Sequence, residues 1–237
     1  MKTKIASIFI LVLGLAYLGS VPRVDAETPE TRNVALVTFR VGDVQLIRDG
    51  KEEPLRVRSL VKAEDRIKTG KDSRVIVQFS QDAFISIQEN TDIAVGDIHY
   101  ETGKLGFLIR LFSGRMGVDA QRNKDKYDIR VEGPTVVALV RGTTFMVEAE
   151  ERQTRVLVSH GQVDVEGPGD AQLAVRSGEK VQGDDNGLQK SIQDQFDRQR
   201  LQILEQFRDS KARNFEPLIK QIQRNEELMQ KQNHSIF

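Results

Sequence analysis

The chain has no cysteine and no tryptophan among its 237 residues, and its charges cancel. Without cysteine it can form no disulfide, no thiolate metal site, no thiol nucleophile and no lipid anchor on an N-terminal cysteine. Because 35 basic residues balance 35 acidic ones, no overall field attracts nucleic acid or anionic lipid. A chain of this length buries enough core to fold without disulfides, so the lack of cysteine does not argue against an oxidising compartment.

Common catalytic and cofactor-binding signatures are also missing. The sequence has no G-x-S-x-G elbow, no G-x-x-x-x-G-K-[ST] or G-x-G-x-x-G phosphate loop, and no D-x-D-x-D-G calcium loop. Its histidines, His99, His160 and His234, lack the spacing of a metal site. Adjacent acids such as Glu52 and Glu53 point to opposite faces of a strand, although acids from distant strands could still converge. We therefore expect a protein that is not an enzyme, with no catalytic, cofactor-binding or metal-binding residues and no cofactor.

The N-terminus has the pattern of an export signal. Lys2 and Lys4 precede an uncharged apolar stretch over residues 5–18, and Val24-Asp25-Ala26 supplies a small-residue cleavage site. This stretch is shorter than the roughly 20 residues that span a bilayer, so an uncleaved anchor is the second interpretation. We predict a signal peptide over residues 1–26, a periplasmic or outer-envelope location, and no transmembrane span in the mature chain.

Residues 34–182 predict a β-domain, because short apolar alternations are broken repeatedly by glycine. Two apolar runs flank Arg141-Gly142-Thr143, which predicts a strand, a tight bend and a second strand. Arg141 is then either a corner residue of a sheet or, together with turn amides, an anion ligand. The candidate strands are Ala35–Phe39, Val44–Arg48, Arg74–Phe79, Phe84–Ile87, Ile93–Val95, Leu105–Phe112, Met116–Asp119, Tyr127–Val131, Val136–Val140, Thr144–Ala149, Arg155–Val158, Gln162–Val165, Ala171–Val175 and Lys180–Gln182.

Glycines after small polar residues mark the expected turns. The pairs Asp49-Gly50, Ser113-Gly114, His160-Gly161 and Ser177-Gly178 predict tight hairpins, where positive φ is required. An apolar-x-x-Gly-x-apolar pattern recurs around Gly114 and Gly161, and in a looser form around Gly178. Such a repeat indicates stacked strands with one continuous core, as in β-helices and rolls. A closed barrel or a sandwich leaves much the same pattern.

These motifs carry a resemblance to the FecR domain, a β-rich module of bacterial envelope proteins. The pattern V-R-G-T-x-F-x-V at residues 140–147 is followed by V-x-V-x-x-G-x-V-x-V at residues 156–165. Upstream, residues 42–46, 65–70 and 73–79 continue the pattern, so the resemblance covers residues 34–182. The chain departs from the family at Glu64-Asp65 and Asp82-Ala83-Phe84, which affects local turns. The resemblance implies a β-solenoid-like or roll domain.

Known FecR proteins that relay siderophore signals have a cytoplasmic sigma-factor-regulating segment and a membrane helix before this module. This chain has only the export signal at that place, so we expect no direct anti-sigma role. No regulatory residue is carried over from the family.

The hydrophobic period changes after the β-domain. We expect a polar linker over residues 183–190 and a C-terminal amphipathic helical tail over residues 191–237, with Ser191 as N-cap, Asp194 in the first turn, and a kink or second helix at Pro217. Several apolar residues of this tail are eleven apart, which is typical of a nearly straight helix. The tail packs back on the β-domain, pairs with another copy or protein, or lies on a membrane. The apolar residues are Ile192, Phe196, Ile203, Leu204, Phe207, Phe215, Leu218, Ile219 and Ile222.

One stretch is locally basic. It holds Arg110, Arg115, Arg122, Lys124, Lys126 and Arg130, interleaved with Phe107, Phe112 and Tyr127 and interrupted by Asp119, Asp125 and Asp128. Nucleic-acid binding asks for an uninterrupted basic stripe with stacking aromatics, so we expect no nucleic acid. A solvated face or a contact with an anionic glycan are the remaining interpretations.

We therefore expect a non-catalytic exported envelope protein whose β-domain is a protein-interaction or signalling module. The expected partner is another envelope protein or a second copy bound through the C-terminal helix. The alternative is a cell-wall glycan-binding or structural envelope protein that uses Phe84, Tyr100 and Tyr127. We also expect that deleting residues 191–237 leaves the β-domain folded but removes partner capture or self-association.

Overall fold

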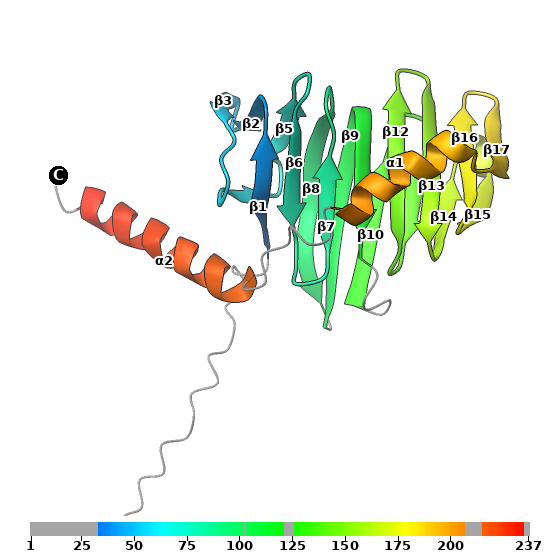
Figure 1. The fold of residues 1–237 in the computed structure, drawn as a ribbon. Helices are drawn as coiled ribbons and strands as arrows, with labels where there is room; N and C mark the ends of the chain where they lie inside the picture. Colours follow the sequence, from blue (N-terminus) through cyan, green and yellow to red (C-terminus); the bar gives the residue numbers. More distant parts are fainter. Residues whose placement is uncertain (1–32, 102, 121–125, 207–214, 235–237) are drawn as a thin grey trace, which may run out of the picture.

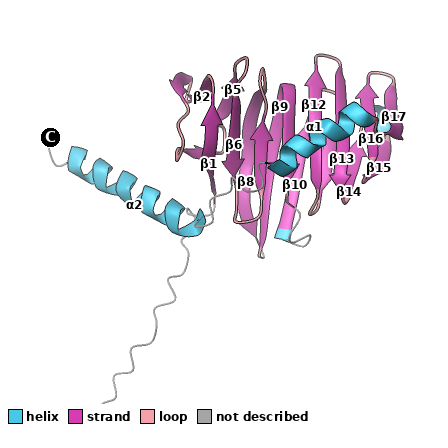
Figure 2. Ribbon diagram, viewed as in Figure 1, coloured by secondary structure: helices cyan, strands magenta, loops and turns pink. Residues whose placement is uncertain are grey.

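The structure is a computed structural model that describes residues 33–101, 103–120, 126–206 and 215–234. The described residues form 17 strands and two α-helices, so the mainly β expectation is confirmed (Figure 2). The predicted signal peptide lies outside the described residues. The strands form two stacked sheets, here named A and B, that share the long strand β9 (Lys104–Asp119).

Sheet A contains the second half of β9 and eight further strands. In spatial order these are β4 (Leu60–Lys62), β1 (Val34–Val41), β6 (Arg74–Gln78), β7 (Phe84–Ile87), then β9, β12 (Thr144–Glu150), β13 (Gln153–His160), β16 (Glu179–Asp184) and β17 (Gly187–Ile192).

Sheet B contains the first half of β9 and runs alongside. Its order is β3 (Lys51–Pro54), β2 (Val44–Arg48), β5 (Arg66–Thr69), β8 (Asp92–Glu101), then β9, β10 (Tyr127–Glu132), β11 (Val137–Val140), β14 (Gln162–Glu166) and β15 (Gln172–Arg176). A 3-10 helix, Pro168–Asp170, precedes β15.

One hydrophobic core fills the space between the sheets. Alternate residues of both sheets point inward, for example Val75 and Val77 from β6 and Ile109 and Leu111 from β9, all buried. The strand pairings are antiparallel except β9 with β10, and the sheet is not closed. The solenoid-like part of the expectation is therefore not confirmed, because a solenoid stacks successive coils with parallel strands, whereas here the core is that of a sandwich.

Most glycine turns connect the two sheets instead of forming hairpins. Gly142, Gly161 and Gly178 have φ of 64°, 88° and 82°, and each lies where the chain crosses from sheet B to A or back. At Gly114, with φ of 91°, β9 itself passes from B to A. The hairpin expectation was thus wrong at Gly114, Gly161 and Gly178 and correct at Asp49-Gly50, where Arg48 pairs with Lys51. At Gly142 the expected strand, tight bend and strand are present as β11 and β12. At Gly142 and Gly161, both edges of each flanking strand are already hydrogen-bonded to other strands, so the two flanking strands cannot pair with each other.

The β-domain extends beyond its expected end. Residues 183–190, expected as a linker, form the turn and most of the hairpin between β16 and β17, with Asp184 opposite Gly187 and Glu179 opposite Ile192. Leu188 packs against the core, while most of β17 is exposed. This strand ends the sheet and reads as polar because only a small part of it meets apolar neighbours.

Two helices follow, and both contact the outer side of sheet A. α1 (Gln195–Gln206) lies across β9, β12 and β13, and α2 (Phe215–His234) begins near β1 and extends past the end of the sheets (Figure 1). Pro217 lies in the first turn of α2, as expected if it begins a second helix. Phe215 and Ile219 pack against strands β1 and β4. Within the described residues, neither helix is long and apolar enough to cross a membrane.

Candidate functional site

The outer face of sheet B is the open face of the molecule. No described helix packs on it, whereas α1 and α2 both contact sheet A. Its outward side chains combine partly exposed apolar residues, among them Leu108 and Leu139, with the exposed Arg110 and Arg130. Arginine and apolar side chains together are the composition that protein interfaces favour. We call this surface the sheet B face.

An aromatic and ionic cluster lies on the part of the sheet B face formed by β5, β8 and β9. The Arg66 guanidinium lies 4.7 Å from the ring centroid of Phe112, which is 45% exposed. Asp92 accepts two hydrogen bonds from Arg66, each 2.6 Å long, and these raise the Arg66 pKa above its ordinary value. The carboxylate therefore fixes a flat cation over an exposed aromatic ring, which prepares a rigid contact surface.

A second cluster continues the sheet B face along β9 and β10. Arg110 and Arg130 each place Nε 3.1 Å from a different oxygen of Glu132. These are half-exposed pairs, which contribute little stability in water. Their consequence is orientation, because Glu132 holds both guanidinium groups beside the apolar Leu108.

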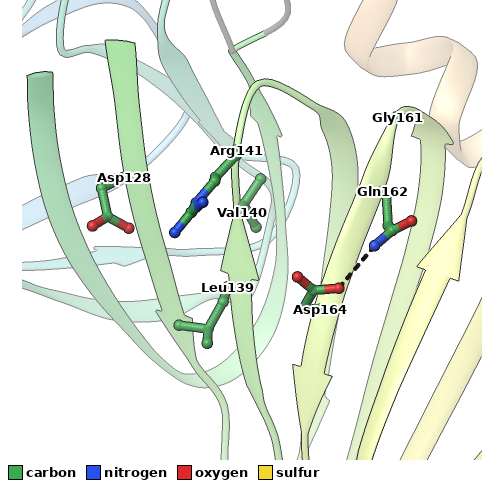
Figure 3. A pocket seen from close by; sticks show the side chains of 7 residues that line it. All are labelled: Asp128, Leu139, Val140, Arg141, Gly161, Gln162 and Asp164. Carbon is green, nitrogen blue, oxygen red and sulfur yellow. Dashed lines mark hydrogen bonds between the residues drawn. The ribbon is translucent and has the colours of Figure 1, made fainter. Parts of the chain in front are cut away.

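A shallow pocket of about 380 Å³ marks the end of this face at the arch between β11 and β12 (Figure 3). Arg141 reaches over it toward Asp128 of β10, while Asp164 of β14 lies on its other side and accepts a 3.0 Å hydrogen bond from Gln162. Leu139 lines its floor. An anion here would meet two carboxylates as well as Arg141, so the structure favours the sheet-corner interpretation of Arg141.

On the opposite sheet, close packing of side chains holds α1 in place. Leu201 and Leu204 are buried against Met146 and Leu157 of sheet A. Leu204 occupies space left by Gly117 of β9, since a Cβ on that glycine would lie 1.8 Å from the leucine methyl. The sequence analysis missed this contact, because it needs the register of β9 with α1. Two buried leucines stabilise the docked helix by roughly 1.5–3 kcal/mol each.

Ion pairs with a buried carboxylate also hold α1 on sheet A. Glu148 of β12 is almost fully buried and is surrounded by arginines from three elements: Arg115 of β9 at 2.8 Å, Arg155 of β13 at 2.9 Å and Arg200 of α1 at 3.1 Å. Ion pairs with three arginines offset the free-energy cost of removing this carboxylate from water. The sequence analysis named Arg115 as part of a basic run but did not find Glu148 or Arg200, because their proximity depends on strand register.

The start of α1 is defined by reciprocal caps. Asp194 accepts a 2.9 Å hydrogen bond from the Asp197 backbone, and Asp197 accepts one of 3.0 Å from the Asp194 backbone. The ammonium of Lys180 pairs with both carboxylates, and its hydrogen bond to Asp197 is the main reason its pKa is raised. Ser191 belongs to β17, and the helix is capped by Asp194 instead, so the expected N-cap was wrong.

The three histidines do not come together in one site. His99 pairs with Asp97 at 2.8 Å, and His160 contacts Ser159 at 2.9 Å, so neither lies in a shared site. His234 ends α2, and nothing is described of its side chain. Among the described residues, no three histidines or acids come together as a metal site would need.

The aromatic residues proposed for glycan stacking are mostly internal. Phe84 is fully buried and Tyr127 nearly so, with the Tyr127 hydroxyl 2.8 Å from that of Ser80. Burial raises the pKa of this tyrosine. Tyr100 is 41% exposed and is the one of the three left at the surface. The use of Phe84 and Tyr127 as glycan platforms is therefore wrong.

The locally basic run does not form one surface. Arg110 and Arg130 lie on the sheet B face, whereas Arg115 points to the other side of the molecule and pairs with Glu148. Lys126 is exposed, and Arg122 and Lys124 lie outside the described residues. This split follows from β9, whose two halves belong to different sheets.

Comparison with known proteins relates part of this sandwich to a known family. Residues 65–164 match the family model described as FecR protein. The chain therefore contains a FecR-like domain, and the resemblance seen in the sequence is confirmed for this part. No curated protein is significantly similar to the chain.

Two solved structures also align with the chain. Both are crystal structures of a protein from Parabacteroides distasonis that is described as a candidate anti-sigma factor, at 2.50 and 1.65 Å resolution. They share 19% identity with this chain, cover 54% of it, and give TM-scores of 0.45 and 0.44. The alignments span 60% of those chains.

Proposed function

We propose that this protein is a non-catalytic, exported envelope protein whose FecR-like domain binds another envelope protein as part of a signalling or regulatory system. The observation that carries the proposal is the FecR match over residues 65–164 together with the open sheet B face. Strands β5 to β11 and the first residues of β14 lie within the matched range, so the matched segment builds most of that face.

The chemistry of the sheet B face supports a protein as the ligand. Phe112 and Leu139 offer apolar anchors, and Arg66, Arg110 and Arg130 are already oriented by acids. Preoriented arginines and an exposed aromatic ring are the side chains that most often dominate binding energy at protein interfaces. Because the charges on this face are mixed, a protein with matched charges fits it better than a polyanion.

Crosslinking in intact cells tests this proposal. A photo-reactive amino acid at Phe112 is expected to give a discrete protein adduct that mass spectrometry identifies. The same group at Asp185, an exposed turn residue at the far end of sheet A, is the matched control and is expected to give none. Arg66→Ala in the Phe112 probe strain is expected to weaken the adduct, since it removes the cation held over the ring.

Three results count against the proposal. Equal adducts from Phe112 and Asp185 mean that the sheet B face has no specific ligand. Adducts to cell-wall glycan strands without a protein favour the alternative of a glycan-binding or structural envelope protein. Detection of the protein in the cytoplasm after fractionation contradicts the exported location.

A further inference from the structure

The two ionic clusters of the sheet B face share one arrangement, in which a single carboxylate serves two cations. Asp92 accepts two hydrogen bonds of 2.6 Å from Arg66 and also lies 3.9 Å from the ammonium of Lys68. Glu132 serves the two arginines of the second cluster in the same way. Because two cations share one anion, each cluster keeps a net charge of +1.

The cations of these clusters lie closer to solvent than the acids that hold them. The side chains of Asp92 and Glu132 are 19% and 29% exposed, whereas those of the four cations are 41–47% exposed. A ligand that approaches this face therefore meets positive charge first. Because the acids already orient the cations, an ion pair with a ligand costs less side-chain entropy than it would with free arginines.

Strand register places the two clusters side by side. Arg66 of β5 is opposite Ala94 of β8, and Ala94 is opposite Arg110 of β9. Arg110 is in turn opposite Glu132 of β10. This row crosses four strands, so the clusters spread over about 14 Å. Alternate side chains of an extended segment are about 7 Å apart, so two carboxylates on one ligand segment can reach both clusters at once.

An apolar patch lies beside this row on β9. Leu108, Arg110 and Phe112 alternate with buried residues and share the outward side of the strand. Phe112 is half-exposed and Leu108 is partly exposed. An anionic glycan would leave both apolar groups uncovered and would meet Asp128 and Asp164 at the end of the same face (Figure 3). A protein segment that combines acids with an apolar side chain matches both parts of the surface.

We propose that the sheet B face binds an acidic segment of its partner protein. One carboxylate of the segment pairs with each cation cluster, and an apolar side chain between them packs against Phe112. Charge complementarity selects this occupant, because each cluster holds one positive charge in excess and repels a basic segment. The inference rests on the proposed function and names the chemistry of the partner at the same face.

Charge reversal in the Phe112 probe strain tests the inference. Arg110→Glu changes the net charge of its cluster from positive to negative and is expected to reduce the yield of the protein adduct at least about tenfold. Lys68→Glu is expected to act in the same direction at the other cluster. Arg176→Glu makes the same change at an exposed position of β15, at the far end of sheet B, and is expected to leave the yield unchanged. Urea unfolding of the purified variants separates lost binding from lost folding.

The crosslinked segment supplies a second test. Mass spectrometry of the adduct is expected to show at least two Asp or Glu residues near the point of attachment. A synthetic peptide of that segment is then the probe for calorimetry, with each acid replaced in turn by Lys. At least one of these peptides is expected to bind Arg110→Glu more tightly than it binds the wild-type protein, because the exchanged charges match again.

Failure of this inference is distinguishable from failure of the proposed function. If the adduct is a protein but its segment has no acids, or if Arg110→Glu leaves the yield unchanged, the inference is overturned and the proposed function stands. Equal losses in Arg110→Glu and Arg176→Glu also overturn it, because they show a response to net charge alone, as does an adduct between two copies of this chain. Equal adducts from the Phe112 and Asp185 probes, or an adduct to glycan alone, overturn both.

Discussion

A buried charged side chain in this domain can link two strands that do not pair with each other. Asp65 is 1% exposed and accepts hydrogen bonds from the Arg48 guanidinium at 2.7 and 2.6 Å, and one from the Lys62 backbone at 2.7 Å. Arg48 also donates to the Leu60 carbonyl at 2.9 Å. One carboxylate thus joins β2 of sheet B to β4 of sheet A. Asp65 agrees with the FecR pattern, from which the chain departs at the preceding residue, Glu64, and its role is structural.

Removing the Asp65 charge is expected to destabilise the protein clearly. Asp65→Asn leaves the arginine without its bidentate partner, so we expect a loss of about 2–3 kcal/mol, below the roughly 3–5 kcal/mol of a fully buried pair because Arg48 is partly exposed. Asp185→Asn breaks the exposed pair with Arg152 and is expected to cost less than about 1 kcal/mol. Urea unfolding measures both, and equal losses would show that burial of Asp65 is unimportant.

At the scale of one element, α1 is held to sheet A by a glycine, two leucines and a buried acid. The contact between Gly117 and Leu204 is the most specific of these. Gly117→Ala is expected to push Leu204 away and to increase hydrogen exchange in residues 195–206, because the added methyl lies well inside contact distance.

A second substitution tests whether that contact is the cause. Leu204→Ala in the Gly117→Ala background removes the collision, so the double variant is expected to be more stable than the sum of the two single losses predicts. Urea unfolding of the four proteins gives this coupling energy. Additive losses contradict a direct contact between the two positions.

The N-cap of α1 makes its docking sensitive to acid. Backbone donation from Asp197, followed by the hydrogen bond from Lys180, lowers the pKa of Asp194 to about 2 from the ordinary 3.8. A carboxyl group with a lowered folded-state pKa stabilises the protein above its unfolded value and loses that contribution as pH falls through the folded value.

We therefore expect the stability difference between wild type and Asp194→Asn to be constant above pH 4 and to disappear as pH falls through about 2. Asparagine keeps the cap geometry and removes the charge, so the comparison isolates ionisation. Urea unfolding at a series of pH values measures it. A difference that is the same at pH 2 and pH 6 would sink this assignment.

For the whole molecule, the sequence allowed prediction of the interior better than of the connections. Strands such as β10 and β14 alternate clearly and were predicted, whereas β3 and β17 are polar strands at the ends of the sheets and were missed. The period of two says which residues point inward but not which sheet a strand joins. Leu105–Phe112 and Met116–Asp119 were therefore predicted as two strands, although β9 runs through both and bends at Gly114.

The candidate surfaces were less accessible to prediction for the same reason. Arg66 and Phe112 are 46 positions apart in sequence, and their contact needs the register of β5, β8 and β9. The tail was predicted as helical, but its single stripe turned out to be two, since Asp197 takes an inner position that the pattern assigned to no role. The burial of an acid on a helix can be understood only once its cation, here Lys180, is known to lie beside it, and the sequence does not show this.

The extent of the folded unit changes the expected result of truncation. Removal of residues 191–237 was expected to leave the β-domain intact, but the cut passes through β17 and removes Gln193, whose amide donates 2.8 Å hydrogen bonds to the carbonyls of Val158 and Glu179. A chain ending at Asp194 keeps these bonds and loses only the helices. We expect the chain ending at residue 190 to be less stable than it by about 2–3 kcal/mol, from several lost hydrogen bonds of roughly 1 kcal/mol each.

Urea unfolding of the two truncated proteins measures that difference. The sheet B face and its crosslink from Phe112 are expected to be retained in the chain ending at Asp194. That chain also exposes Met146 and Leu157 of sheet A, so it is expected to be less soluble than the full protein. Equal stability of the two truncations would mean that Gln193 and the end of β17 do not belong to the folded unit.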